Sequence, residues 1–221
     1  MITITNEDNM ELMARYEDNH FDLAIIDPPY GINMGKKKTI GKRGKTYSTT
    51  IYRQSQWDSK IPTKEYFEQL FRVSKNQIIF GANYFNEFLP PSMGWFVYDK
   101  RQPDGFSMAQ AELAYTSFNR SIRMKGFKRS DVQNCVSNNK AIALSNAKIH
   151  QCQKPIPLYR FLLQTYAKQG DKILDTHLGS GSIAIACHEY KYDLTACELD
   201  TAYYNAAMKR LSIVQAQTKL F

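Results

Sequence analysis

The chain lacks the features that direct proteins to membranes or to the secretory pathway. Its first ten residues, MITITNEDNM, contain neither a basic stretch nor an apolar one, and no run approaches the ~18 consecutive apolar residues of a membrane-spanning helix. It has only four cysteines and four histidines, which form no C-x-x-C pair and no spacing typical of metal ligands. These absences predict a cytoplasmic protein with reduced thiols, without a membrane anchor and without a metal site.

Acidic residues are also comparatively few. Asp and Glu number 21 against 29 Lys and Arg, which leaves a net charge of +8 on 221 residues. Such a charge favours a polyanionic partner, although it says nothing about the fold. A large share of it lies in GKKKTIGKRGK, residues 35–45, at Lys36, Lys37, Lys38, Lys42, Arg43 and Lys45. A solvated surface loop is one explanation of this segment, and contact with nucleic acid is the other.

Apolar patterns predict strands and helices that alternate along almost the whole chain. Strands are expected at 2–5, 21–26, 76–82, 172–178 and 193–200, and helices at 7–16, 62–74, 83–89, 154–170, 180–191 and from 201 onward. This alternation is typical of an α/β protein with one doubly wound, mostly parallel sheet. Successive strands at 94–100 and 111–117 predict an antiparallel hairpin at one edge.

The whole chain, residues 1–221, is expected to form a single domain, because it is long enough for one α/β core and short for two. Two segments stand apart from the regular pattern. Residues 33–60 contain the basic loop, and residues 118–150 are polar and basic without clear periodicity. The second segment includes Arg120 and Arg123, which with the basic loop are candidates for contact with a polyanion.

The segment DLAIIDPPYGI, residues 22–32, joins a short apolar run to two consecutive prolines. The run predicts a buried strand, and the prolines end it because they lack N–H donors and restrict φ. A tight turn is the simpler explanation of Asp27-Pro28-Pro29-Tyr30. The alternative is that a carboxylate and stiff carbonyl groups are held at the carboxyl end of a strand, where open α/β sheets bind ligands.

A second motif occupies residues 172–200, KILDTHLGSGSIAIACHEYKYDLTACELD. It predicts a strand, a glycine-containing turn, a helix and a further strand. Gly179 and Gly181 allow the backbone to approach a ligand at the start of the helix. Glu198 follows about 20 residues further on, where a carboxylate can accept hydrogen bonds from both hydroxyls of a ribose. The motif therefore indicates a cofactor that contains a nucleoside.

A dinucleotide is one candidate for this cofactor, because residues 179–184 also satisfy the dinucleotide pattern G-x-G-x-x-A. Two observations disfavour a dinucleotide. The motif opens the last strand-helix-strand unit of the chain, and Asp175 would face a pyrophosphate unfavourably. An acidic residue there suits a cationic cofactor better, and S-adenosylmethionine carries both an ammonium and a sulfonium.

The order of these motifs resembles the beta-group DNA amino-methyltransferases, in which the catalytic motif precedes the cofactor motif. IIFGANYF, FVYDK and Glu112 fit the family's intervening motifs, and His150 to Pro155 resembles its H-P-T-Q-K-P box. The resemblance covers nearly the whole chain. It departs from the family at Asp175-Thr176-His177, where Asp-Pro-Phe is usual, so cofactor packing near His177 is expected to differ.

The resemblance implies S-adenosylmethionine as cofactor, DNA as partner, and a methyltransferase variant of the Rossmann-like fold. It implies roles in catalysis for Asp27, Pro28, Pro29 and Tyr30. Cofactor binding is expected to involve Asp8, Asn9, Asp27, Lys154, Asp175, Gly179, Ser180, Gly181, Ser182, Glu198 and Leu199. Asn83 and Tyr84 would touch the target base or serve packing, and Tyr203 is expected in the core of the last helix.

In this family, Asp at the head of the catalytic motif favours adenine N6, whereas Ser is commoner for cytosine N4, which stays open here. An enzyme that modifies a glutamine amide is disfavoured by Asp27. A nicotinamide-dependent oxidoreductase and a non-catalytic nucleic-acid-binding module remain as alternatives from other classes. Because the segments expected to read DNA are short, a short target or loose specificity is expected, with a homodimer as one way to extend recognition.

Overall fold

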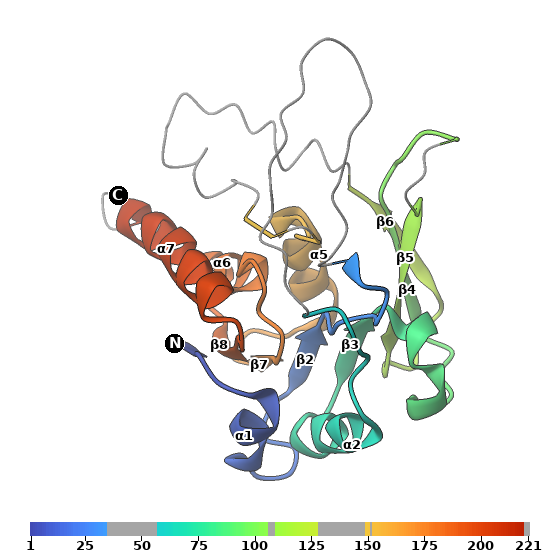
Figure 1. Ribbon diagram of the computed structural model, residues 1–221, viewed down its shortest axis with the longest axis horizontal. Helices are drawn as coiled ribbons and strands as arrows, with labels where there is room; N and C mark the ends of the chain where they lie inside the picture. Colours follow the sequence, from blue (N-terminus) through green and yellow to red (C-terminus); the bar gives the residue numbers. More distant parts are fainter. Residues whose placement is uncertain (35–56, 106–108, 128–148, 151, 219–221) are drawn as a thin grey trace.

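The computed structural model describes residues 1–34, 57–105, 109–127, 149–150 and 152–218 (Figure 1). In this part of the chain, eight strands form one sheet in the order β1-β8-β7-β2-β3-β5-β4-β6. The strands are β1 (Ile2–Thr5), β2 (Leu23–Ile26), β3 (Gln77–Phe80), β4 (Trp95–Asp99), β5 (Ala111–Thr116), β6 (Arg123–Gly126), β7 (Lys172–Asp175) and β8 (Asp193–Cys197). Every neighbouring pair is parallel except the two that involve β5. The predicted doubly wound, mostly parallel sheet is therefore confirmed.

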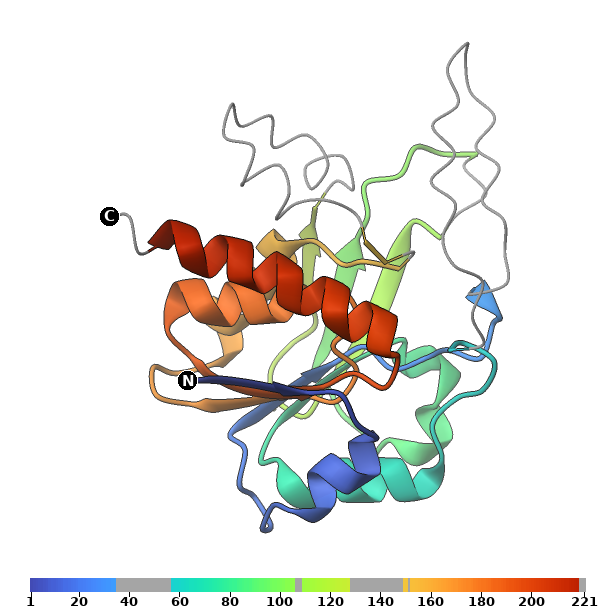
Figure 2. The same cartoon turned by 60° about the vertical axis from the view of Figure 1, so that its left-hand side comes forward.

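Helices cover both faces of the sheet, as Figure 2 shows. One face carries α5 (Ile156–Tyr166), α6 (Ser182–Tyr190) and α7 (Thr201–Thr218), and the other carries α1 (Asn9–Ala14) and α2 (Lys64–Val73). Two short 3₁₀ turns, η2 (Ala82–Tyr84) and η3 (Asn86–Phe88), follow β3. They replace the single helix expected at 83–89, since Gly81 adopts a left-handed conformation and Phe85 interrupts the run.

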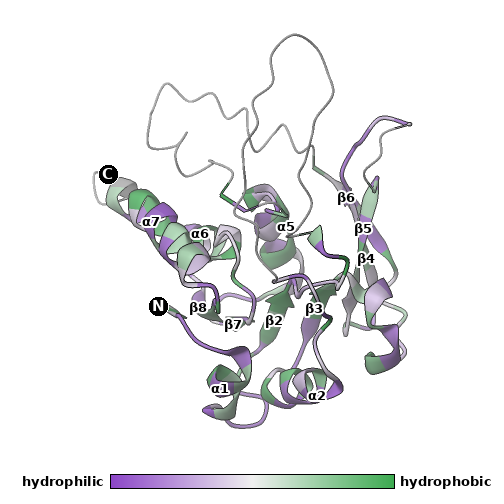
Figure 3. Cartoon of the chain, viewed as in Figure 1, coloured by the Kyte–Doolittle hydropathy of each residue, from purple (hydrophilic) through white to green (hydrophobic). Residues whose placement is uncertain are grey.

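The strand β2 shows why the chain needs both layers of helices. All four of its residues are buried, and Figure 3 shows it as hydrophobic along its length. Side chains alternate across a strand, so Leu23 and Ile25 enter the core under α5 and α6. Ala24 and Ile26 enter the core under α1 and α2. The two cores place β2 and the turn that follows it in the middle of the molecule.

The hairpin prediction was partly wrong. The strands β4 and β5 do pair antiparallel, but β5 lies inside the sheet between β3 and β4. The edge is formed by β6, which pairs parallel with β4 within the segment expected to be an irregular insert. Most of β6 is exposed, with Met124 68% accessible, so it has no alternating apolar pattern that the sequence could have revealed.

No helix in the described ranges is long and apolar enough to cross a membrane. Cys152, Cys187 and Cys197 are free thiols.

Candidate active site

The sheet order brings the two sequence motifs together. β7 and β2 are parallel neighbours, and successive connections run outward from them in opposite directions, to β8 on one side and to β3 on the other. Such a switch point leaves a crevice at the carboxyl ends of the strands, where α/β sheets bind ligands. The turn after β2 and the glycine-containing turn after β7 therefore face the same space.

A cavity of about 1390 Å³ occupies this edge of the sheet. Its volume exceeds the ~300–1,000 Å³ of a pocket for one small ligand. Its walls come from the residues after β2, β3, β7 and β8 and from the start of β5, and they include Asp27, Tyr30, Tyr84, Glu112, Gly179 and Glu198. The cavity has room for two ligands side by side, one at each motif.

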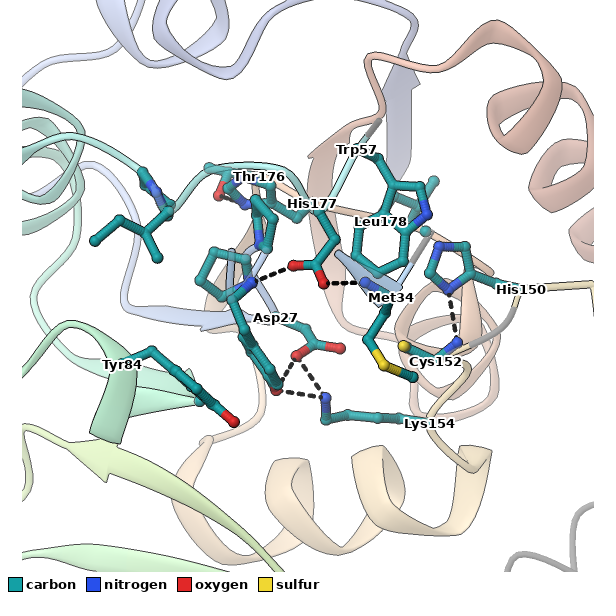
Figure 4. Close-up of a pocket in the computed structure, with 18 of the residues that line it drawn as sticks. Asp27, Met34, Trp57, Tyr84, His150, Cys152, Lys154, Thr176, His177 and Leu178 are labelled. Carbon is teal, nitrogen blue, oxygen red and sulfur yellow. Dashed lines mark hydrogen bonds and ion pairs between the residues drawn. The ribbon is translucent and has the colours of Figure 1, made fainter. Parts of the chain in front are cut away.

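Asp27 lies directly after β2, and all four residues of the Asp-Pro-Pro-Tyr turn line the cavity. One oxygen of its carboxylate accepts a hydrogen bond from the Tyr30 hydroxyl at 2.7 Å and pairs with the Lys154 ammonium at 2.5 Å (Figure 4). The Lys154 side chain is only 4% exposed, whereas that of Asp27 is 20% exposed. The carboxylate is thus held from below by a buried cation and stays open to the cavity.

Lys154 lies between two carboxylates. Its ammonium is 3.0 Å from Glu112, which pairs with Lys100 at 2.5 Å. Burial opposes its charge, but Asp27 and Glu112 outweigh this effect and raise the pKa of Lys154. Burial likewise opposes ionisation of Glu112, yet Lys154 and Lys100 lower the pKa of its carboxyl to about 2.

The same burial raises the pKa of Asp27, against the opposing effect of Lys154. A carboxylate whose pKa is raised is a better proton acceptor than an exposed one. Lys154, expected to bind the cofactor, lines the cavity beside Asp27 and Tyr30. This position follows from the fold, because Lys154 immediately precedes α5, which packs over β2.

The ring of Tyr30 lies parallel to that of Tyr84, with centroids 5.0 Å apart and an interplanar angle of 14°. Tyr84 is 42% exposed, and both rings line the cavity. The approach of Tyr30 depends on Gly81, which has φ +69°, because a Cβ atom there would lie 2.1 Å from the Tyr30 ring. The glycine that follows β3 therefore makes room for the tyrosine of the Asp-Pro-Pro-Tyr turn.

Gly81→Ala is expected to lower the midpoint of thermal unfolding and to reduce enzymatic turnover. The left-handed backbone costs an alanine about 1–2 kcal/mol. The added methyl group would also displace Tyr30, and a displacement of ~1 Å at a reacting site can cost ~10²-fold in rate.

Gly105→Ala is the matched control for this prediction. Gly105 has φ +76°, but no described atom beyond its chain neighbours lies within 4 Å of its would-be Cβ. Both variants should lose stability, and only Gly81→Ala should lose turnover in the folded protein. Equal turnover in the two variants would contradict the proposed contact.

The glycine-containing turn after β7 is organised by Glu198. The Glu198 carboxylate accepts hydrogen bonds from the Gly179 N–H at 2.8 Å and the Asp200 N–H at 2.9 Å. Burial raises the pKa of Glu198. Glu198, Leu199, Gly179 and Ser180 line the cavity, and Leu199 is 70% exposed.

Gly181 and Ser182 lie deeper, at the start of α6. Gly181 has φ +70°, and a Cβ there would come within 3.1 Å of Ala207 on α7. The Ser182 hydroxyl is buried and contacts Ser180 at 3.1 Å and the Arg210 guanidinium at 3.0 Å. These two residues shape the turn and do not line the cavity, whereas the sequence suggested direct contact with a cofactor.

Asp175 is 2% exposed and does not line the cavity. Burial raises the pKa of its carboxyl to about 8, and it accepts a hydrogen bond from the His177 N–H at 3.0 Å. His177 itself lines the cavity, and burial lowers the pKa of its imidazole to about 3, so the ring is neutral.

His177 is also well anchored in spite of replacing the family's usual Phe. Its Nε2 lies 3.1 Å from the Asn9 amide, and its Nδ1 lies 2.9 Å from the Thr176 hydroxyl. Asn9 lines the cavity. Asp8, expected to take part in cofactor binding, accepts the Met10 N–H at 2.7 Å as the N-cap of α1 and does not line the cavity.

Most of the residues expected to contact DNA lie outside the described part of the chain. Lys36, Lys37, Lys38, Lys42, Arg43 and Lys45 lie outside the described residues. Arg120 is engaged within the protein, since it donates to the Thr165 carbonyl at 3.0 Å and lies over the rings of Phe118 and Tyr166. Arg123 opens the edge strand β6 and is exposed.

Four residues at or near the site belong to none of the motifs recognised in the sequence. Trp57 lines the cavity with a buried indole N–H that has no hydrogen-bond partner among the described residues, and its ring lies 4.8 Å from that of His150. Tyr203 contacts His150 from the other side and lines the cavity, so its expected place in the core was wrong. Arg210 donates to the Ser180 carbonyl at 2.7 Å. Asp58 is 2% exposed and binds the turn after β2.

Comparison with known proteins agrees with this arrangement. The family model for DNA methylases matches residues 87–209, more than half of the chain. The type II methyltransferase M.HpaI of Haemophilus parainfluenzae is 23% identical over 235 aligned positions, which cover 91% of this chain and 71% of that protein.

Solved structures share the fold. The M1.HpyAVI–SAM complex matches with a TM-score of 0.59 and 16% identity, covering 96% of this chain and 99% of that one. The cytosine-N4-specific PvuII DNA methyltransferase matches with a TM-score of 0.61 and 12% identity, covering 97% of this chain and 91% of that one. With its Asp-Pro-Pro-Tyr turn and its glycine-containing turn on one cavity, the chain belongs to the DNA methylase family, whose methyl donor is S-adenosylmethionine.

Proposed function

We propose that the protein methylates the exocyclic N6 of adenine in DNA, on a base rotated out of the duplex. The observation that carries this proposal is the Asp27 carboxylate, which lies at the head of the Asp-Pro-Pro-Tyr turn and reaches the cavity while Lys154 pairs with it from below. Asp at this position favours adenine in the family that the chain resembles. The M1.HpyAVI complex, which contains SAM, supports the same cofactor here.

The described residues fit S-adenosylmethionine at the β7 and β8 side of the cavity. Glu198, which lines the cavity, would accept hydrogen bonds from ribose hydroxyls, and Gly179 and Ser180 would allow close approach. The indole N–H of Trp57 has no partner within the described part of the chain and would offer a donor on the same cavity. Asp175 would lie beneath this part of the cavity, where burial raises the pKa of its carboxyl to about 8. When bound, the cofactor supplies an electrophilic methyl group on its sulfonium.

The target amino group needs help because its lone pair is delocalised into the ring. The Asp27 carboxylate and the Pro28 carbonyl are two acceptors, one for each N–H, and can direct the lone pair toward the methyl group. Asp27 can then accept the proton released from the methylated nitrogen. The raised pKa of Asp27 suits that step. Positioning of this kind accounts for much of the rate that enzymes gain.

The parallel rings of Tyr30 and Tyr84 provide an aromatic surface for an extruded base. A base taken out of the duplex must recover stacking energy in the enzyme, and aromatic side chains supply about 1–3 kcal/mol per base. Phosphate contacts are assigned to the basic residues of 36–45 and to Arg123, because a cationic surface binds DNA through its backbone.

The test is to incubate unmethylated DNA with the purified protein and labelled S-adenosylmethionine and to separate the methylated nucleosides. N6-methyladenine is the expected product. N4-methylcytosine would show the cytosine activity of the PvuII enzyme's class and would overturn the choice of base. The absence of methylated nucleosides with saturating cofactor would favour a non-catalytic DNA-binding role.

A further inference from the structure

Asp58 holds the backbone of the catalytic turn from outside the motif. Its carboxylate accepts three N–H groups, from Tyr30 at 2.7 Å, from Gly31 at 2.9 Å and from Met34 at 2.8 Å. Its own carbonyl accepts the Asn33 N–H at 2.9 Å. Figure 4 shows the bond to Met34 as a dashed line. The buried carboxylate of Asp58, a residue only 2% exposed, therefore binds the backbone of residues 30–34.

The stretch needs such a partner because it has no regular structure of its own. Residues 27–33 belong to no helix or strand, and the two prolines have no N–H to donate. Gly31 and Asn33 have φ angles of +73° and +57°, which a helix or strand would not allow. Buried backbone N–H groups without partners are costly, so Asp58 supplies acceptors that the local sequence cannot.

The position of Asp58 connects it to the reacting groups through one residue. Tyr30 gives its backbone N–H to Asp58 and its hydroxyl to Asp27. In the sequence, Met34 directly precedes residues 35–56, and Asp58 is the second residue after them. Both ends of the segment that contains the basic loop are thereby joined to the catalytic turn.

We propose that Asp58 is a positioning residue for methyl transfer, which fixes the backbone of Tyr30 to Met34 and so the place of Asp27 and Tyr30 in the cavity. This rests on the proposed function of the Asp-Pro-Pro-Tyr turn, although it does not depend on which base is methylated. Asp58 is far from the glycine-containing turn in the chain and has no hydrogen bond to it among the described contacts. Its loss should therefore affect the reaction more than cofactor binding.

The experiment compares Asp58→Asn and Asp58→Ala with the wild-type protein in single-turnover methylation and in calorimetric titration with S-adenosylmethionine. The rate should fall by about 10²-fold in Asp58→Ala. Asp58→Asn should be intermediate, because its amide keeps one acceptor oxygen. Cofactor affinity should stay within about threefold of the wild-type value, because Asp58 positions the groups that face the target base and not those that face the cofactor.

Asp22→Asn is the matched control. Asp22 also accepts a backbone N–H, from Lys172 at 2.9 Å, and pairs with Lys75 at 2.7 Å, but it lies before β2, at the opposite end of the strand from the catalytic turn. Its substitution should lower stability and leave the rate of folded enzyme unchanged. The same rate loss in Asp22→Asn and Asp58→Asn would overturn a positioning role, as would a wild-type rate in Asp58→Asn.

Hydrogen exchange separates a failure of this proposal from a failure of the proposed function. The amides of Tyr30, Gly31 and Met34 should exchange faster in Asp58→Asn than in wild type, whatever activity the protein shows. Unchanged exchange in that peptide would overturn the proposal. A wild-type protein that exchanges as expected but methylates nothing would overturn the function alone.

Discussion

Asp27→Ala is expected to lower the rate of methyl transfer by about 10²–10⁴-fold, the scale of a lost positioned proton acceptor. The variant removes the carboxylate that we propose orients the amino group and receives its proton. Lys154 keeps Glu112 as a partner at 3.0 Å, so no unpaired buried cation remains to unfold the site. The glycine-containing turn and its bonds to Glu198 are untouched, and cofactor affinity should change by no more than a few-fold.

Methyl transfer from labelled cofactor to unmodified DNA, measured at saturating S-adenosylmethionine, checks the first half of this expectation, and calorimetric titration checks the second. Asp27→Asn is the companion variant, since it keeps the shape of the side chain and loses the negative charge. It should also be strongly impaired. If Asp27→Ala methylates at close to the wild-type rate, the Asp-Pro-Pro-Tyr segment is only a turn.

Glu198→Ala should give the opposite pattern. A hydrogen bond to a charged group contributes about 1.5–3 kcal/mol, so the loss of the ribose acceptor should weaken cofactor binding by about 10–150-fold. The variant also leaves the N–H groups of Gly179 and Asp200 without their acceptor, which loosens the turn that faces the cofactor. Much of the activity should return when the cofactor concentration is raised, because the groups around Asp27 are intact.

Glu189→Ala provides the control for the second variant. Glu189 is a carboxylate on α6 that pairs with Arg160 at the surface and does not line the cavity. Cofactor affinity should be unchanged in Glu189→Ala and strongly reduced in Glu198→Ala. A Glu198→Ala protein that binds S-adenosylmethionine as tightly as wild type would place the ribose elsewhere in the cavity.

The local parts of the fold could be predicted because their signals are local. A run of four apolar residues followed by two prolines indicates a buried strand and its end, and observed β2 lies within the predicted segment. Glycines before an apolar helix likewise indicated the start of α6. By contrast, β6 is exposed and polar at the edge of the sheet, and its pairing with β4 leaves no periodic pattern in the chain.

The candidate site divides in the same way. Asp27, Tyr30, Gly179 and Glu198 could be found in the sequence, since each belongs to a motif whose spacing reflects a turn or a strand end. The residues that hold these groups in place could not be found in the sequence. Asp58 contacts Tyr30, and Arg210 contacts Ser180, in each case through a hydrogen bond between a side chain and the backbone. The two residues of each pair are far apart in the sequence, so no local pattern predicts these contacts.

The order of the residues is enough to tell which groups are available for chemistry and where they occur, because prolines, glycines and apolar runs act on their own neighbourhood. Which of those groups come into contact depends on how the strands and helices are arranged in the folded protein. β7 lies beside β2, which joins the two motifs on one cavity, and the antiparallel β5 brings Glu112 to the same edge. Lys154 consequently lies against Asp27, because strand order and helix packing, rather than spacing along the chain, set the distance between them.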